Sequence, residues 1–186
     1  TAAFLPSAPA ACIYNPHITF NDQSVTDGQH PITSWEWDYG NGVTEVNTAP
    51  PFGHTYATAG TYTVSLTVTD SYGCKDKISR TAAVVISKPV ADFYSPDTAS
   101  CIGKPVSFIN NSWGVSLNYT WDFGDGQGAT AINPVHNYAN TGLYPVKLVV
   151  VDLYGCRDSI TKPNYINISM PQDGFTVSDS VGTCPP

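Results

Sequence analysis

An internal repeat constrains this chain more than any other feature of its sequence. The hexapeptide Trp121-Asp122-Phe123-Gly124-Asp125-Gly126 occurs a second time upstream, in altered form, as Trp37-Asp38-Tyr39-Gly40-Asn41-Gly42. Further along, His54-Thr55-Tyr56 matches His136-Asn137-Tyr138, and the agreement continues for about 30 more residues. Two copies of one long pattern indicate two copies of one domain.

The repeat predicts the domain organisation. We expect residues 1–88 to form a first domain, residues 89–170 a second, and residues 171–186 the first strand of a third, truncated domain. An isolated strand has unpaired backbone groups and no core of its own. We therefore expect the tail to pack through Phe175 on a neighbouring domain or chain.

Alternating apolar and polar residues predict β-strands in both copies. Tyr62, Val64, Leu66 and Val68 alternate with threonines and serine, and the same pattern follows Tyr144. Side chains on a strand point alternately to its two faces, so one face should be buried. Short alternating segments separated by turn residues, without helical periodicity, indicate an all-β protein of antiparallel β-sandwiches.

The combined motif resembles a known family. The run from Trp121 to Gly126, then His-x-Tyr, then Gly-x-Tyr-x-Val-x-Leu-x-Val-x-Asp is similar to the PKD (polycystic kidney disease) domain. This resemblance covers nearly the whole chain, and it implies tandem immunoglobulin-like sandwiches of about seven strands each. The early and late cysteine of each copy resembles the pair in PKD repeats of large bacterial surface and gliding-associated secreted proteins.

Four cysteines occupy equivalent places in the two copies. Cys12 and Cys101 each follow an aligned Phe by eight residues, and Cys74 and Cys156 each end a Tyr-Gly-Cys turn. The simplest pairing by repeat equivalence is Cys12 with Cys74 and Cys101 with Cys156; four buried free thiols are the alternative. Disulfides predict an oxidising location, so we expect the protein outside the cell, at the cell surface.

Charge and hydropathy exclude two classes of partner. The formal net charge is −7 at pH 7, which would repel a phosphate backbone, so nucleic acid is not an expected partner. No apolar run approaches the roughly 18 residues that span a bilayer, and we expect no membrane insertion. The opening residues Thr1 to Phe4 lack the features of a signal peptide, and the chain reads as a piece of something longer.

The residues that could carry chemistry favour structural roles. His54 and His136 recur at one repeat position beside a Tyr, and we expect them to pack rather than to catalyse or bind metal. Asp38, Asp122 and Asp125 lie beside glycines and could contribute to a structural calcium site, although turn capping is the favoured role. No Ser-His-Asp set with catalytic context is present, so we predict a protein without enzymatic activity or cofactor.

Surface positions offer two further predictions. Trp113 lies in a loop and could stack on a sugar or insert into a partner, or else cover one end of the core. Thr98, Ser159 and Ser180 match an Asp-Ser/Thr-aliphatic pattern that resembles the O-glycosylation signal of surface proteins of some gliding bacteria, so the protein is a candidate glycoprotein.

Two functions remain open at this point. The first is a structural and adhesive array, a stalk or filament segment of a large cell-surface protein linked with gliding motility. Its partners would be neighbouring copies, further repeats, surface glycans or other cell-surface proteins. The alternative is a set of accessory polymer-binding PKD modules in a secreted hydrolase.

Overall fold

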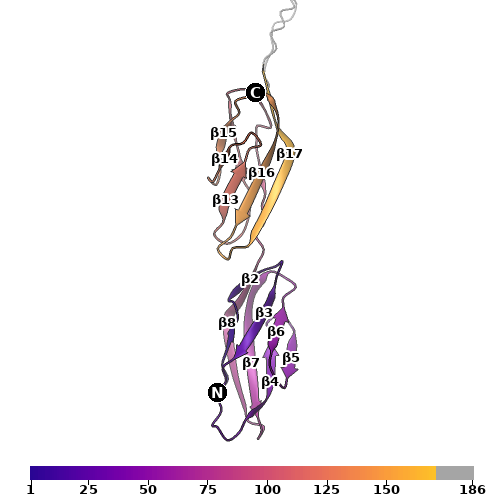
Figure 1. The fold of residues 1–186 in the computed structure, drawn as a ribbon, viewed down its shortest axis with the longest axis vertical. Helices are drawn as coiled ribbons and strands as arrows, with labels where there is room; N and C mark the ends of the chain where they lie inside the picture. The colour runs from indigo at the N-terminus through magenta and orange to yellow at the C-terminus, as the bar shows by residue number, and fades with distance from the viewer. Residues whose placement is uncertain (171–186) are drawn as a thin grey trace, which may run out of the picture. The chain divides into compact units, whose positions relative to one another are not determined.

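The structure is a computed structural model that describes residues 1–170, and these contain strands and turns but no helix. Over the described residues the chain divides into two compact units, one from Thr1 to Lys88 and the other beginning at Pro89 (Figure 1). The tail predicted to begin a third domain, with Phe175 and Ser180, lies outside the described residues. Over residues 1–170 no helix is present that is long and apolar enough to cross a membrane.

Unit 1 is a sandwich of two sheets. One sheet has the strand order β1-β3-β6 and the other the order β2-β8-β7-β4-β5. The strands of unit 1 are β1 (Phe4–Pro6), β2 (Ala10–Cys12), β3 (His17–Asp22), β4 (Ile32–Asp38), β5 (Thr44–Asn47), β6 (Phe52–Thr55), β7 (Gly60–Asp70) and β8 (Lys75–Ser87).

Unit 2 repeats this arrangement. A five-stranded sheet has the order β10-β17-β16-β13-β14, and the opposite layer consists of the pairs β11-β15 and β12-β9. The strands of unit 2 are β9 (Phe93–Tyr94), β10 (Ala99–Cys101), β11 (Pro105–Ser107), β12 (Ile109–Asn110), β13 (Asn118–Asp122), β14 (Gly128–Ala129), β15 (Val135–Asn137), β16 (Gly142–Val151) and β17 (Arg157–Ser169).

The predicted all-β sandwich fold is confirmed, with one departure from antiparallel order in each unit. The short strand β2 runs parallel to β8, with Cys12 opposite Ser87, and β10 runs parallel to β17, with Cys101 opposite Ser169. Pro6 is the last residue of β1 and Pro9 directly precedes β2, and proline cannot donate to a ladder of hydrogen bonds. The first segment therefore leaves one sheet and joins the edge of the other.

Each unit has its own aromatic core. In unit 1, Trp37 from the five-stranded sheet packs against Phe4 and Phe20 from the opposite sheet, at ring centroid distances of 5.1 and 5.2 Å. In unit 2, Trp121 takes the same place against Phe93 and Phe108. Strand alternation buries the predicted faces of β7 and β16, because Val64, Leu66, Val146 and Leu148 have no exposed surface.

A tyrosine near the start of the long central strand closes each sandwich. Tyr62 donates its hydroxyl hydrogen to the Thr58 carbonyl oxygen at 2.7 Å, and Tyr144 donates to the Asn140 carbonyl oxygen at 2.9 Å. A tyrosine that bonds back to the backbone just upstream is a hallmark of immunoglobulin-like sandwiches, where it fixes the corner between two strands. The Tyr62 ring is buried and the Tyr144 ring is partly buried, and the hydroxyl of each has a hydrogen-bond partner.

Candidate functional site

The repeated motif forms a tight turn after β4 and β13. Gly40 and Gly124 have φ values of +76° and +79°, which glycine adopts without the steric cost of a Cβ. A Cβ at Gly40 would collide with the Thr63 carbonyl oxygen, and one at Gly124 with the Pro145 carbonyl oxygen. The glycines therefore let this turn lie directly against the neighbouring strand.

The acidic residues of the motif cap this turn. Asp38 Oδ1 accepts a hydrogen bond from the Gly40 amide, and Asp122 Oδ1 accepts one from the Gly124 amide, both at 2.9 Å. Asp125 Oδ1 accepts from the Gln127 amide at 3.0 Å. The predicted turn-capping role is confirmed. Among residues 1–170, no group of three or more His, Cys, Asp or Glu side chains is arranged to hold a metal ion.

The two repeated histidines are packing residues, as predicted. His54 is stacked on Tyr39 at a centroid distance of 4.1 Å, and His136 is stacked on Phe123 at 4.2 Å. Both are buried. Their hydrogen-bond partners differ, because Asn41 Nδ2 donates to His54 Nε2 at 2.9 Å, whereas His136 Nε2 donates to Asp125 Oδ2 at 2.8 Å.

This difference in partner has an electrostatic consequence. Burial lowers the pKa of His54 below its ordinary value, because the charged imidazolium is poorly solvated there, and an amide donor facing Nε2 requires the neutral ring. Nearby Tyr56 and Tyr138 are also buried, which raises the pKa of each phenol well above its ordinary value. Their hydroxyls donate to the carbonyl oxygens of Tyr39 and Phe123.

The cysteines are bonded differently from the prediction. Cys12, Cys101 and Cys156 are disulfide-bonded, whereas Cys74 is an exposed free thiol. A disulfide is thus confirmed, but the pairing of Cys12 with Cys74 is wrong.

The length of one strand explains the error. Cys12 lies opposite Ser87, the last residue of β8, and Cys74 directly precedes Lys75, the first. The 13 residues of β8 separate the two positions by about 40 Å at 3.3 Å per residue. A disulfide needs Cα atoms within about 7 Å. Strand β17 separates Cys101 from Cys156 in the same way, which excludes that pair as well.

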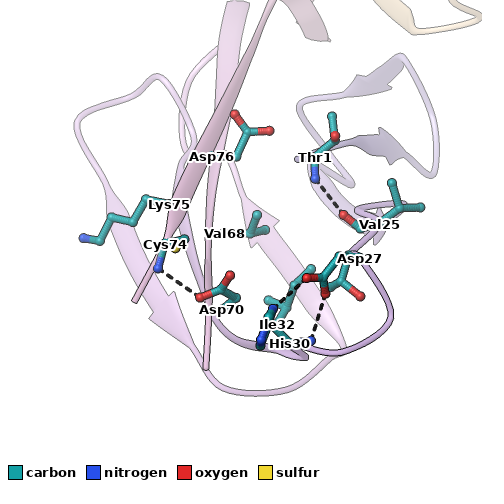
Figure 2. A pocket seen from close by; sticks show the side chains of 11 residues that line it. Thr1, Val25, Asp27, His30, Ile32, Val68, Asp70, Cys74, Lys75 and Asp76 are labelled. Atoms are coloured by element: carbon teal, nitrogen blue, oxygen red, sulfur yellow. Dashed lines mark hydrogen bonds and ion pairs between the residues drawn. The ribbon is translucent and has the colours of Figure 1, made fainter. Parts of the chain in front are cut away.

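A hollow lies beside Cys74 at one end of unit 1 (Figure 2). Its volume is about 350 Å³, and side chains that line it include Val25, Asp27, His30, Ile32, Cys74 and Asp76. His30 had no apparent partner in the sequence, yet its Nδ1 lies 2.6 Å from Asp27 Oδ2. The sequence offered one signal for this contact, which is the three-residue spacing of Asp27 and His30 within a loop rich in Thr, Asp and Gly.

The predicted surface aromatic is exposed. The Trp113 side chain is 61% exposed, so it does not cover the core, although its backbone is held by paired hydrogen bonds with Val90. Tyr72 and Tyr14 are similarly exposed, at 76% and 68%.

Of the glycosylation candidates, Thr98 and Ser159 are exposed and Ser180 lies outside the described residues. Sugar at these positions stays a prediction.

The fold and the repeated turn define a class, that of tandem immunoglobulin-like sandwich modules. The sequence model of the PKD domain matches residues 7–86 and 87–168. The chain belongs to the PKD domain family.

Its curated relatives are much longer proteins. The chain is 40% identical over 67 residues to a microbial collagenase of Vibrio alginolyticus, covering 36% of this chain and 8% of that protein. It is 44% identical over 144 residues to the pre-pro-metalloprotease PrtV of Vibrio cholerae, covering 76% of this chain and 15% of that protein.

Two of the solved structures to which the chain is similar are single PKD domains. The PKD1 domain of Vibrio anguillarum Epp is 32% identical and covers 44% of this chain and 95% of its own, with a TM-score of 0.38. The PKD1 domain of the Vibrio cholerae metalloprotease PrtV is 33% identical and covers 45% of this chain and 94% of its own, with a TM-score of 0.37.

Proposed function

We propose that these two PKD domains are non-catalytic modules of an extracellular hydrolase and help it to engage an insoluble protein polymer. One observation carries this proposal. The relatives that match the chain at 40% and 44% identity are a collagenase and a metalloprotease, and the matched segments form only 8% and 15% of those proteins. In such proteins the remaining length is available for a catalytic domain, and the PKD segment is an accessory part.

The surface of the units is suited to binding rather than catalysis. The polar residues of the repeated turn are occupied by hydrogen bonds to the backbone, and the two histidines are buried in ring stacks. Exposed aromatic side chains, Trp113, Tyr72 and Tyr14, are free to contact a partner. Large, rigid aromatic side chains dominate the energetics of many protein interfaces.

The redox state of the cysteines supports an extracellular location. Cys12, Cys101 and Cys156 are disulfide-bonded, and structural disulfides persist in oxidising compartments rather than in the cytoplasm. Attachment to a cell surface is a separate expectation that the relatives do not address.

The proposal is tested by sedimenting the chain with insoluble fibrous collagen. We expect the 186-residue chain to be retained in the pellet in a saturable manner. Trp113→Ala should weaken retention at least about fivefold, the equivalent of about 1 kcal/mol for a buried aromatic contact. Val46→Ala, which removes an exposed aliphatic side chain in the other unit, is the matched control and should leave retention unchanged. A chain that stays in the supernatant with collagen, or that is retained equally well by chitin and cellulose, would contradict the proposal.

A structural and adhesive array remains a second candidate function. The observation in its favour is the set of disulfide-bonded cysteines in both units, because covalent cross-links resist unfolding under load. The complete polypeptide separates the two candidates. A hydrolase domain in the same polypeptide supports the accessory module, whereas dozens of further PKD repeats without one support the stalk or filament.

A further inference from the structure

The turn that carries Cys74 has the same construction as the turn that carries Cys156. Asp70 Oδ1 accepts hydrogen bonds from the amides of Tyr72 and Cys74, both at 2.9 Å. Asp152 Oδ1 accepts from the amides of Tyr154 and Cys156, at 2.9 and 2.8 Å. The backbone therefore presents the two cysteines in the same way, although their chemical states differ.

Cys156 shows which bond a cysteine at this repeat position can form. It is disulfide-bonded and almost fully buried, whereas Cys74 is a free and exposed thiol. Cys12, the other cysteine of unit 1, lies about 40 Å from Cys74 along β8, so no partner for Cys74 exists within its own unit. The repeat thus places an unbonded thiol where the equivalent residue forms a disulfide.

The hollow beside Cys74 provides room for an incoming segment. One wall is the loop in which unit 1 is four residues longer than unit 2. Asp27 holds that loop by accepting from the amides of Gln29 and His30, each at 2.9 Å, and the His30 ring lies edge-on to Tyr72 at 4.3 Å. Val25, Ile32 and Val68 supply an apolar lining, and Asp27, Asp70 and Asp76 supply negative charge (Figure 2).

We propose that Cys74 is a cross-linking site that forms a disulfide with the early cysteine of another PKD unit. Early cysteines are of the kind represented by Cys12 and Cys101, and each is followed by an isoleucine that suits the apolar lining of the hollow. The bond forms as the Cys74 and partner thiols lose two electrons and two protons. A low-molecular-weight disulfide such as oxidised glutathione accepts them and becomes two thiols.

The first measurement is made on the 186-residue chain purified without reductant. Alkylation followed by peptide mapping should find the Cys74 thiol fully reactive. Incubation with a buffer of oxidised and reduced glutathione should leave the chain monomeric, because the early cysteines of both units are already bonded. A dimer linked through two Cys74 residues would overturn the proposal, because it would assign the thiol to symmetric pairing between molecules.

The second measurement adds a partner unit. A copy of residues 1–89 is placed before Thr1, which reproduces the spacing between the two natural units. The thiol of Cys74 in the original copy should fall from full reactivity to less than about a tenth, and mapping should recover a peptide that links it to Cys12 of the added copy. Cys12→Ser in the added copy should restore full reactivity. If the original Cys74 stays reactive while circular dichroism shows native β-structure, the proposal is wrong.

Discussion

Gly40 shows how one residue permits the repeated turn. Its φ of +76° and the carbonyl oxygen of Thr63 beside it both exclude a side chain. Gly40→Ala should destabilise unit 1 by about 2–3 kcal/mol, the sum of left-handed strain and a forced shift of β7. Gly42 has a similar φ of +86° but open space around it, so Gly42→Ala should cost only about 1 kcal/mol. Chemical denaturation of each variant measures the difference, and equal effects would contradict this account.

His54 makes unit 1 sensitive to acid. Its pKa is lowered in the folded state, so the unfolded chain binds more protons between that lowered pKa and the ordinary value of about 6.5. The free energy of unfolding of unit 1 should therefore keep its full value above about pH 6.5. It should decrease as the pH drops from about 6.5 through the lowered pKa of His54. Thermal melting at pH 7.5 and at pH 5.0 measures the loss, and His54→Gln should reduce it.

Burial is the main cause of the lowered pKa of His54, and we expect the side chain at position 41 to modulate this response because Asn41 bonds to the ring. Unit 2 has Asp125 in its place, whose carboxylate accepts from His136 Nε2. Asn41→Asp should give His54 the same acceptor, favour the protonated ring and shrink the loss of stability at low pH. If Asn41→Asp leaves the pH dependence of melting unchanged, the partner of His54 does not modulate it.

At the scale of elements, the equivalent strands β4 and β13 each carry a buried tryptophan. The two indole N–H groups differ in whether they have a hydrogen-bond partner. Trp121 on β13 donates its indole hydrogen to the Ala131 carbonyl oxygen at 2.9 Å. Trp37 on β4 is buried, and its Nε1 finds no partner among the described residues. The segments that follow these strands differ in sequence, and among the described residues a carbonyl oxygen lies within hydrogen-bond distance of the indole only in unit 2.

Replacing each indole tests this difference. Trp37→Phe and Trp121→Phe remove the same volume from similar aromatic cores, so their cavity costs should be similar. Trp121→Phe also removes a hydrogen bond and should be more destabilising by about 0.5–1.5 kcal/mol. Urea unfolding of the two variants gives the comparison. A larger cost for Trp37→Phe would mean that its indole has a partner in solution.

The long final strand of each unit determines which cysteines are too far apart to form a disulfide. Because β8 and β17 keep the early and late cysteines at opposite ends, peptide mapping without reductant should recover neither a Cys12–Cys74 nor a Cys101–Cys156 linked peptide. Free thiol should be found at Cys74 and not at Cys12, Cys101 or Cys156. Recovery of either excluded pair would show that the sheet register differs from the one described here.

At the scale of the whole molecule, the two units have separate cores. The buried residues of unit 1, centred on Trp37, form one cluster, and those of unit 2, centred on Trp121, form another. Trp121→Ala should cost unit 2 about 3–5 kcal/mol and increase hydrogen exchange throughout β16. The amides of β7 should keep their protection within about a factor of two. Equal loss of protection in β7 would show that the two cores unfold together.

Several features followed from the sequence alone because they are local. The alternation from Tyr62 to Val68 determines which face of β7 is buried, and the paired glycines of the motif determine the turn. The recurrence of His54 and His136 beside tyrosines correctly predicted packing. In each case the spacing of a few residues along one strand is enough, since side-chain direction on a strand has a period of two.

Three features could be found only from the tertiary structure. These are which cysteines are disulfide-bonded, the hollow beside Cys74 and the hydrogen-bond partner of His30. Repeat equivalence showed that Cys12 and Cys101 correspond, and that Cys74 and Cys156 correspond, but it carried no information on distance. Only the parallel pairing of β2 with β8 places Cys12 beside Ser87 and leaves a whole strand between it and Cys74. Local pattern determines the face on which a residue lies, whereas the distance between two residues depends on which strands are neighbours and in what register.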